Sequence, residues 1–202
     1  METEVLKKIR EIRGIIQVGA NTGQESSLFR KYTSNVMCFE PIKDVFISLT
    51  KNNPDFICYN FALGERNEIK NMNIASNNGE SSSFLKPLNH LTQFTSIQFT
   101  HTESVEIKRF DSLGIDINNF NVLISDTQGY EIQVLKGFGD FLKKLDYIYV
   151  EYINSELYED CSSLDKIQDY LKQYSFNLDS IYPENSNWGN VLFINNNKQL
   201  KN

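Results

Sequence analysis

The feature that most constrains the fold is an alternation of short apolar, β-branched runs with amphipathic segments. This alternation is typical of strand–helix–strand units that build a parallel sheet. The runs expected to form strands are residues 15–18, 36–39, 56–61, 122–125, 147–151, 176–181 and 191–194. The sequence therefore predicts an α/β fold with a doubly wound, Rossmann-like sheet of seven strands.

Segments between these runs have the spacing of amphipathic helices. They are residues 25–31, 43–51, 130–144 and 163–173. In the third, Leu135, Phe138 and Leu142 recur at helical spacing and share one face. Residues 1–13 are charged, with apolar residues at helical spacing, so we expect an N-terminal helix there and not a secretory signal.

Residues 67–108 interrupt the alternation. They contain the strand-like stretches "EIKNMNIA" and "SVEIKRF" on either side of a polar and aromatic segment. An excursion of about 40 residues is longer than an ordinary connection, and such segments tend to be functional. We expect a β-rich insertion between the third and fourth core strands that contributes to substrate contacts. No Pro-rich linker marks a boundary, so residues 1–202 should form one domain.

The composition of the chain disfavours some classes of binding partner. The net charge is −6 and the lysines are scattered, which disfavours nucleic acid, and no apolar run is long enough to span a membrane. The cysteines, Cys38, Cys58 and Cys161, form no CxxC pair. We interpret them as buried thiols in a reducing compartment and expect a cytoplasmic protein.

The stretch "IIQVGANTGQES" joins the first expected strand to a helix through Gly19 and Gly23. The spacing GxxxG differs from the GxGxxG of dinucleotide-binding proteins, so a pyrophosphate is not indicated. Glu40 closes the next strand, where a carboxylate in a doubly wound sheet can accept hydrogen bonds from ribose hydroxyls. Together the two features predict a cofactor that contains ribose. We also expect alanine at Gly19 or Gly23 to harm cofactor binding far more than folding.

Candidate catalytic groups cluster at the ends of later strands. Asp126 and Glu151 follow the fourth and fifth strands, where they could transfer protons, hold a divalent cation or bind substrate hydroxyls. Glu131 is either a further member of this group or only a favourable partner of the helix dipole. His101 and His90 lie in the insertion, and we rank His101 higher as a base.

The chain resembles the FkbM-type methyltransferases, a branch of the class I S-adenosylmethionine-dependent enzymes. The resemblance covers residues 14–194 and is carried, in order, by "IIQVGANTGQES", "CFEP", "FALG", "ESSSF", "SVEIKRFDSL", "SDTQGYEIQVLKG", "YVEY" and "WGNVLF". It implies that the last of the seven strands is antiparallel and that S-adenosylmethionine is the cofactor. It also implies O-methylation of a sugar hydroxyl in a glycan or a glycosylated natural product.

Site residues follow from the matched motifs. The resemblance implies that the methionine part of the cofactor lies on Gly19, Asn21 and Gly23, and that Glu40, beside Pro41, holds the ribose. Ala62 and Leu63 would lie near the adenine. Asp126 and Gln128 would border the methyl group and the acceptor. One departure stands out, because Ser125 and Thr127 flank Asp126 where many relatives have a lysine and a more apolar residue.

Several alternatives stay open. The base is Asp126, His101 or Glu151, or else Asp126 and Glu151 bind a divalent cation that polarises the hydroxyl. A cofactor-binding protein without catalysis, a methyltransferase of a non-sugar small molecule, and a nucleotide-using oxidoreductase or epimerase are the rival functions. Glycan-assembly enzymes are the expected protein partners, and the sequence does not predict an oligomeric state.

Overall fold

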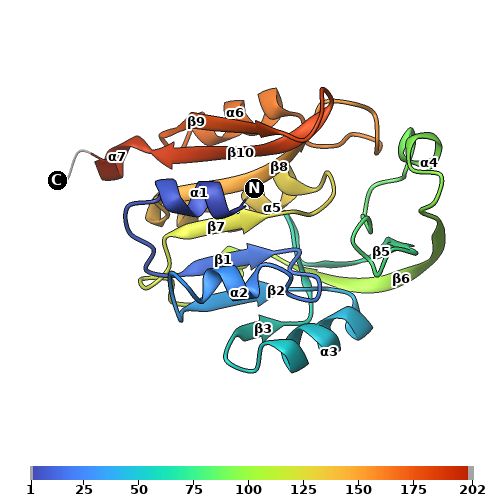
Figure 1. Cartoon of the computed structure of the whole chain (residues 1–202), viewed down its shortest axis with the longest axis horizontal. Coiled ribbons are helices and arrows are strands. Elements are labelled where there is room, and N and C mark those ends of the chain that lie inside the picture. Colours follow the sequence, from blue (N-terminus) through green and yellow to red (C-terminus); the bar gives the residue numbers. More distant parts are fainter. Residues whose placement is uncertain (1, 200–202) are drawn as a thin grey trace.

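The computed structural model describes residues 2–199, and its centre is a seven-stranded sheet. The strands, in spatial order, are β3 (Ile57–Tyr59), β2 (Val36–Phe39), β1 (Ile15–Val18), β7 (Val122–Ser125), β8 (Tyr147–Ile153), β10 (Trp188–Asn195) and β9 (Phe176–Pro183). Within this sheet, β10 pairs antiparallel with both β8 and β9, and the other neighbouring strands pair parallel (Figure 1). The predicted sheet and its antiparallel last strand are confirmed.

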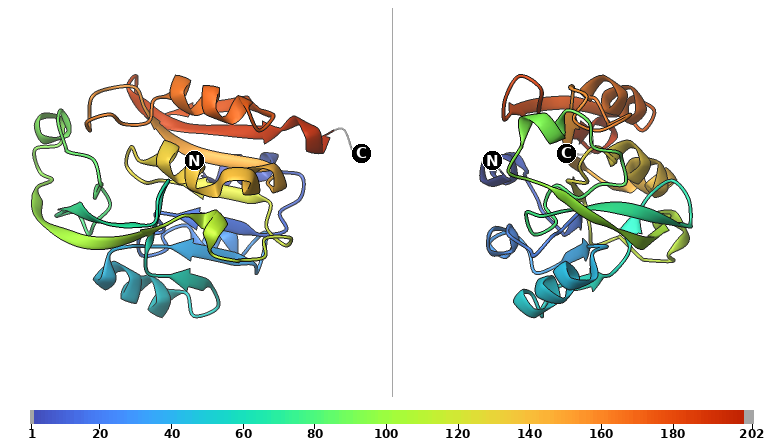
Figure 2. Two further views of the ribbon diagram at one scale, coloured as in Figure 1. Left: turned by 180° about the vertical axis from the view of Figure 1, so that it is seen from behind. Right: turned by 90° about the vertical axis from the view of Figure 1, so that its right-hand side faces the viewer.

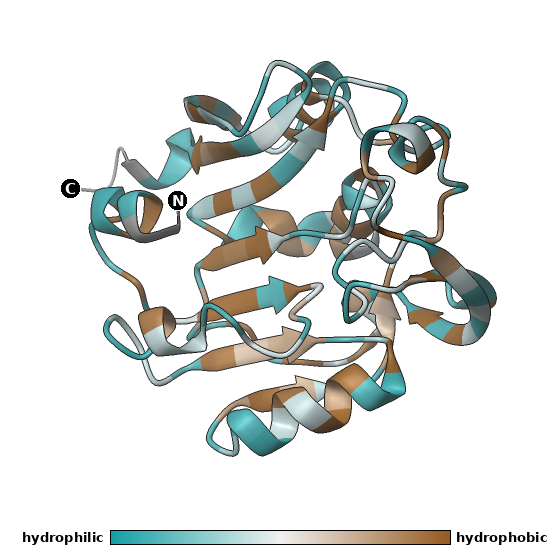
Figure 3. Ribbon diagram, turned by 45° about the vertical axis from the view of Figure 1, so that its right-hand side comes forward, coloured by the Kyte–Doolittle hydropathy of each residue, from teal (hydrophilic) through white to brown (hydrophobic). Residues whose placement is uncertain are grey.

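Helices cover both faces of this sheet. They are α1 (Glu2–Lys8), α2 (Ser26–Phe29), α3 (Lys43–Asn52), α5 (Glu131–Phe138), α6 (Leu164–Lys172) and α7 (Asn196–Gln199), with 3₁₀ turns at η1 (Phe110–Ser112) and η2 (Gly139–Lys144). Neighbouring strand residues point to opposite faces, so Ile15 packs with α1 and α2 while Ile16 packs with α5 and α6. Figure 2 shows the side covered by α5 and α6 from behind, and Figure 3 shows the hydrophobic central strands of the sheet.

Three of the expected strands, 15–18, 36–39 and 122–125, have the observed bounds. The expected helix 130–144 instead breaks at Gly139, whose φ of +51° ends α5 and starts η2. The expected strand 56–61 shortens to β3, and the chain then leaves the sheet for a separate strand, β4 (Ala62–Leu63). The expected helix 1–13 is α1 alone, and Met1 lies outside the described residues.

The insertion forms a second sheet. Its strands β5 (Glu68–Ala75) and β6 (Phe99–Lys108) are antiparallel, β6 also pairs with β4, and α4 (His90–Gln93) lies between β5 and β6 in sequence. Strands β1 and β7 point toward this unit (Figure 1). The insertion shares an apolar cluster with one face of the main sheet through Met72 and Ile107. It therefore stands at the carboxyl edge of the parallel strands. No helix in residues 2–199 is long and apolar enough to cross a membrane.

Candidate functional site

A pocket of about 380 Å³ lies at this carboxyl edge. The loops after β1, β2 and β7, the end of β8 and residues 77–84 of the insertion form its walls. The chain order reverses between β1 and β7, so the pocket occupies the switch point at which open α/β sheets bind ligands. Its volume is within the range of small-molecule sites.

The turn after β1 is held against two neighbouring strands. Gly19 has φ +78°, and the amides of Gly19 and Ala20 both donate to Phe39 O, at 3.0 and 3.1 Å. A Cβ on Gly19 would lie 1.8 Å from the carbonyl oxygen of Asp126. The expectation that Gly19 tolerates alanine in the fold is therefore wrong, because only glycine lets the turn approach the end of β7.

Gly23 has a similar constraint but a different place. Its φ is +82°, and a Cβ there would lie 2.4 Å from Asn53 Nδ2, next to α3. Gly23 is absent from the pocket wall, whereas Gly19 and Asn21 line it. Gly23 therefore shapes the turn from behind, and alanine there is also expected to disturb the fold.

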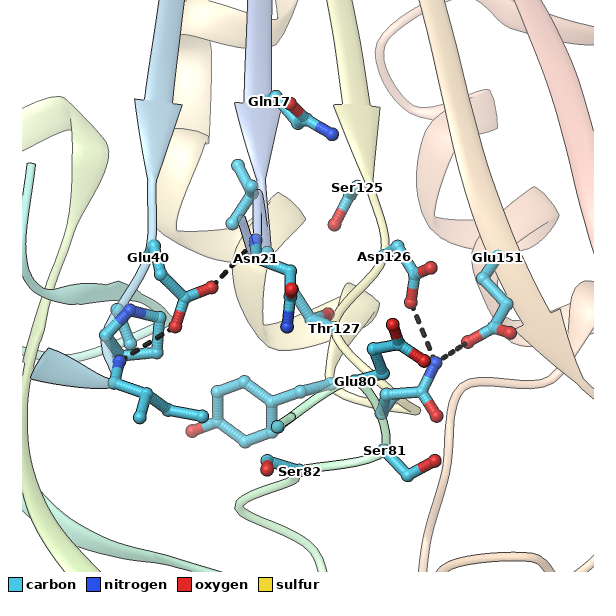
Figure 4. A pocket seen from close by; sticks show the side chains of 18 of the residues that line it. Gln17, Asn21, Glu40, Glu80, Ser81, Ser82, Ser125, Asp126, Thr127 and Glu151 are labelled. Carbon is cyan, nitrogen blue, oxygen red and sulfur yellow. Dashed lines mark hydrogen bonds between the residues drawn. The ribbon is translucent and has the colours of Figure 1, made fainter. Parts of the chain in front are cut away.

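Glu40 is anchored by the backbone around it. Its side chain is 4% exposed, Oε2 accepts from the Asn21 amide at 2.9 Å, and Oε1 accepts from the Ile42 amide at 2.8 Å (Figure 4). Burial raises the pKa of Glu40 to about 7, while the two amide hydrogen bonds oppose this rise. The carboxylate is a fixed acceptor at the end of β2. Pro41, Ala62 and Leu63 line the same part of the pocket.

Asp126 and Glu151 come together through one amide group. Gln128 Nε2 donates to Asp126 Oδ1 at 2.8 Å and to Glu151 Oε2 at 3.0 Å (Figure 4). Burial, followed by the nearby negative charge of Asp126, raises the pKa of Glu151 well above its ordinary value. The structure therefore brings these three predicted residues into one hydrogen-bonded unit that lines the pocket.

Glu131 organises the backbone beneath this unit. It is fully buried, and its Oε1 accepts from Thr127 N at 2.9 Å, Thr127 Oγ1 at 2.9 Å and Gly129 N at 3.2 Å. The turn needs this support because Gln128 and Gly129 have φ of 53° and 94°. Burial raises the pKa of Glu131 to about 7. Interaction with the helix dipole alone therefore does not describe Glu131, because its carboxylate also accepts three hydrogen bonds from the turn.

Of the two histidines, His90 lines the pocket and His101 does not. His101 is exposed on β6, where its Nε2 lies 3.1 Å from Glu103 Oε1, and it does not line the pocket. His90 does line the pocket, is 3% exposed and packs among the rings of Phe94, Phe99 and Tyr158. Burial lowers the pKa of His90. The ranking of His101 above His90 as a base has no support from the pocket wall, because His101 lies in the exposed first half of β6.

The polar lining suits a cationic, hydroxyl-bearing ligand. Ser125 Oγ is buried in the wall without a hydrogen-bond partner among the described residues, and it lies between the Glu40 turn and the Asp126 unit (Figure 4). Carboxylates at both ends of the pocket favour a positive charge such as a sulfonium. These observations fit S-adenosylmethionine. Within residues 2–199, no group of three or more His, Cys, Asp or Glu side chains is arranged to hold a metal ion.

Comparison with known proteins decides the family. The model of the methyltransferase FkbM domain matches residues 17–178, which include the Gly19 turn, Glu40, Asp126 and Glu151. The chain belongs to the FkbM methyltransferase family.

Individual relatives agree with this assignment. The FkbM chain is 28% identical over 194 residues to the 2-O-methyltransferase NoeI of Sinorhizobium fredii, covering 90% of this chain and 79% of NoeI. A TehB-like SAM-dependent methyltransferase from Corynebacterium glutamicum has a similar fold, with a TM-score of 0.54, 8% identity, and coverage of 96% of this chain and 86% of that one. A ribosomal protein L11 methylase from Lactobacillus delbrueckii subsp. bulgaricus also has a similar fold, with a TM-score of 0.54 and 11% identity. The match covers 96% of this chain and 75% of that one. Family and fold together make this chain a methyltransferase of the S-adenosylmethionine-dependent class.

Proposed function

We propose that this FkbM methyltransferase transfers a methyl group from S-adenosylmethionine to a hydroxyl group of a sugar, in a glycan or a glycosylated natural product. The observation that carries the proposal is the Asp126–Gln128–Glu151 unit, which lines the same pocket as the Glu40 turn. The name of NoeI, a 2-O-methyltransferase, supports transfer to oxygen. The resemblance of the sequence motifs to the family supports the sugar.

The cofactor end of the pocket consists of Gly19, Asn21, Glu40, Pro41 and the Ala62–Leu63 strand. Glu40 is the ribose-binding group, because its carboxylate is held rigidly by two amides and retains lone pairs for hydroxyl donors. Ala62 and Leu63 provide an apolar wall for a base. S-adenosylmethionine, when bound, supplies an electrophilic methyl group on a positively charged sulfur.

The acceptor hydroxyl binds at Asp126 and Glu151. A neutral alcohol is a weak nucleophile, so a base must take its proton as it attacks. Glu151 is suited to this role, because its raised pKa makes it a stronger base once ionised. Gln128 fixes the directions of both carboxylates, and both line the pocket where the hydroxyl would bind. In this assignment Asp126 orients the acceptor and Glu151 removes the proton.

The test uses labelled S-adenosylmethionine and the surface glycans of the source organism. Wild type should label a sugar, while Asp126→Asn and Glu151→Gln should each lose about 10²- to 10⁴-fold in rate, the usual contribution of acid–base groups. Cofactor affinity, measured by calorimetry, should change little in both variants. The matched control is Glu103→Gln, a partly buried carboxylate outside the pocket, which should keep full activity.

Other outcomes assign the rival functions. Tight cofactor binding with no labelled product from glycans or small hydroxylated compounds would indicate a binding protein. Label in a small molecule but not in a sugar would indicate a methyltransferase whose acceptor is a non-sugar compound. Loss of activity on EDTA treatment, restored by a divalent cation, would move Asp126 and Glu151 to the metal-binding version of the mechanism.

A further inference from the structure

The acceptor end of the pocket has a wall made by two neighbouring strands. Trp188 and Asn190 of β10 lie opposite Ile153 and Glu151 of β8 in the antiparallel register. All four line the pocket, because alternate residues of paired strands share one face of the sheet. We call these four residues the β8–β10 wall. Trp188 pairs with Ile153, which is two residues along β8 from Glu151, the proposed base.

An aromatic surface closes this end from the side of the insertion. The rings of Phe94 and Trp188 are 5.4 Å apart and inclined at 64°, and both are only partly buried. Phe94 follows α4, so residues from the insertion and from the last strand meet here. Aromatic rings of this kind offer apolar contact area to the C–H face of a sugar ring.

Polar groups also line the acceptor end of the pocket. His90 is 3% exposed and lines the pocket beside Phe94, and its Nδ1 has no hydrogen-bond partner in the described part of the chain. At the rim, Glu184 accepts from Trp188 Nε1 at 3.4 Å and from Asn190 Nδ2 at 3.3 Å. These bonds tie the orientation of the indole ring to a carboxylate.

The acidic side chains at the acceptor end have no basic side chain beside them in the described part of the pocket wall. Asp126, Glu151, Glu184 and Glu80 all line the pocket, and no lysine or arginine lines it among residues 2–199. The nearby Lys70 instead lies over the rings of Tyr130 and Phe84, at 5.1 and 5.9 Å. A negatively charged acceptor would therefore enter without a cation to pair with, which is costly in a partly desolvated site.

We propose that the acceptor end binds a sugar ring that carries no negative charge, stacked on Trp188, and that a protonated amino sugar matches it best. Uronic acids, sugar phosphates and nucleotide sugars are then excluded as acceptors. This inference rests on the proposed sugar O-methyltransferase function and narrows its substrate class. It follows from the β8–β10 wall, the unpartnered His90 nitrogen and the unbalanced carboxylates.

Trp188 is the only tryptophan of the chain, so its fluorescence reports on this end of the pocket without any turnover. We would titrate the protein, saturated with S-adenosylhomocysteine, with methyl glucosaminide, methyl glucoside and methyl glucuronide at pH 7. Saturation-transfer NMR on the same samples gives a second measure of binding. The amine should bind about tenfold tighter than the uronide, corresponding to about 1.4 kcal/mol, with the neutral glycoside between them.

Glu184→Gln removes the charge and keeps one acceptor oxygen, so that one of the two bonds from Trp188 and Asn190 can persist. The preference for the amine over the uronide should then fall to about threefold or less. The matched control is Glu159→Gln, an exposed carboxylate outside the pocket, which should leave the preference unchanged. Equal or tighter binding of the uronide would overturn the proposal. Absence of binding by all three glycosides would overturn it too, and calorimetry with S-adenosylmethionine would show separately whether the cofactor function stands.

Discussion

The two ends of the pocket are built in different ways. At the cofactor end, backbone groups fix the key parts, since two amides hold Glu40 and the Gly19 turn touches the backbone of Asp126. At the acceptor end, side chains hold one another, as Gln128 does with Asp126 and Glu151. Changes at the cofactor end therefore affect folding and binding together. Changes at the acceptor end can alter specificity while the fold persists.

The largest effect is expected for Gly19→Ala. The new Cβ would overlap Asp126 O, so the turn or the end of β7 must move, at a cost of about 3 kcal/mol or more in unfolding free energy. Cofactor binding should be lost in the same variant. Urea unfolding and calorimetry with S-adenosylmethionine measure the two effects.

Gly114→Ala is the matched control for this substitution. Its φ is +67°, yet no atom lies within 4 Å of the Cβ that alanine would add. Only the backbone penalty of about 1 kcal/mol should appear, with cofactor affinity intact. If Gly19→Ala were no less stable than Gly114→Ala, the close approach of the turn to β7 would not limit the fold.

Glu40→Gln should weaken cofactor binding by about 10- to 100-fold, since one acceptor oxygen becomes an NH₂ group that faces a backbone amide. The pH dependence gives a sharper test. Because the pKa of Glu40 is raised to about 7, its carboxylate ionises as pH rises through 7, and wild-type affinity should increase between pH 6 and 8. The affinity of Glu40→Gln should be nearly constant over this range. A parallel increase in the variant would assign the pH dependence to another group.

The difference between the two ends also explains what the sequence could predict. The Gly19 turn and Glu40 belong to one strand–turn–helix–strand unit, so short-range pattern located both. Asp126 and Glu151 were located because the carboxyl ends of parallel strands meet at one edge. The seven strands could be predicted because short buried strands are continuous apolar runs in the sequence.

The remaining features, apart from the end of α5, depend on contacts between distant segments. Gly139 ends α5 with φ +51°, and glycine there is a local helix-stop signal that the prediction of one helix over 130–144 did not use. Which histidine reaches the pocket depends on the path of the insertion over the sheet. Trp188, Phe94 and Glu184 come from two segments far apart in sequence, so their meeting at the acceptor end had no sequence signal. The buried role of Glu131 could have been suspected from its place directly after the Asp126 turn.

Glu131→Gln tests the support beneath the acceptor end. The pKa of Glu131 is about 7 in the folded chain and near 4.5 when unfolded, so between these values the folded state keeps a proton that the unfolded state has lost. Wild-type stability should therefore fall as pH rises through this window. Glutamine removes this loss but accepts the Thr127 and Gly129 hydrogen bonds less strongly. We expect a gain on the order of 1 kcal/mol at pH 8 and no gain at pH 4.5.

Thermal unfolding of both proteins at pH 4.5, 6 and 8 would measure this difference. A variant less stable than wild type at every pH would mean that the three hydrogen bonds need an ionised acceptor. In that case Glu131 would carry its charge in the folded protein, and its effect on Glu151 would be stronger. The matched control is Glu68→Gln, an exposed carboxylate on β5, whose stability should follow wild type across the range.

The smallest effect is expected for His101→Ala, which asks whether the acceptor end extends along β6. His101 is exposed, pairs with Glu103 at 3.1 Å, and is not part of the pocket wall. An exposed pair of this kind contributes at most about 1 kcal/mol, and surface substitutions usually change stability by about 0.5 kcal/mol or less. Methylation rate and its pH profile should therefore match wild type. A rate loss as large as that of Asp126→Asn would make His101 the base. That result would require β6 to bend toward Glu151 when the acceptor binds, and the acceptor end would then depend on movement of the insertion as well as on the β8–β10 wall.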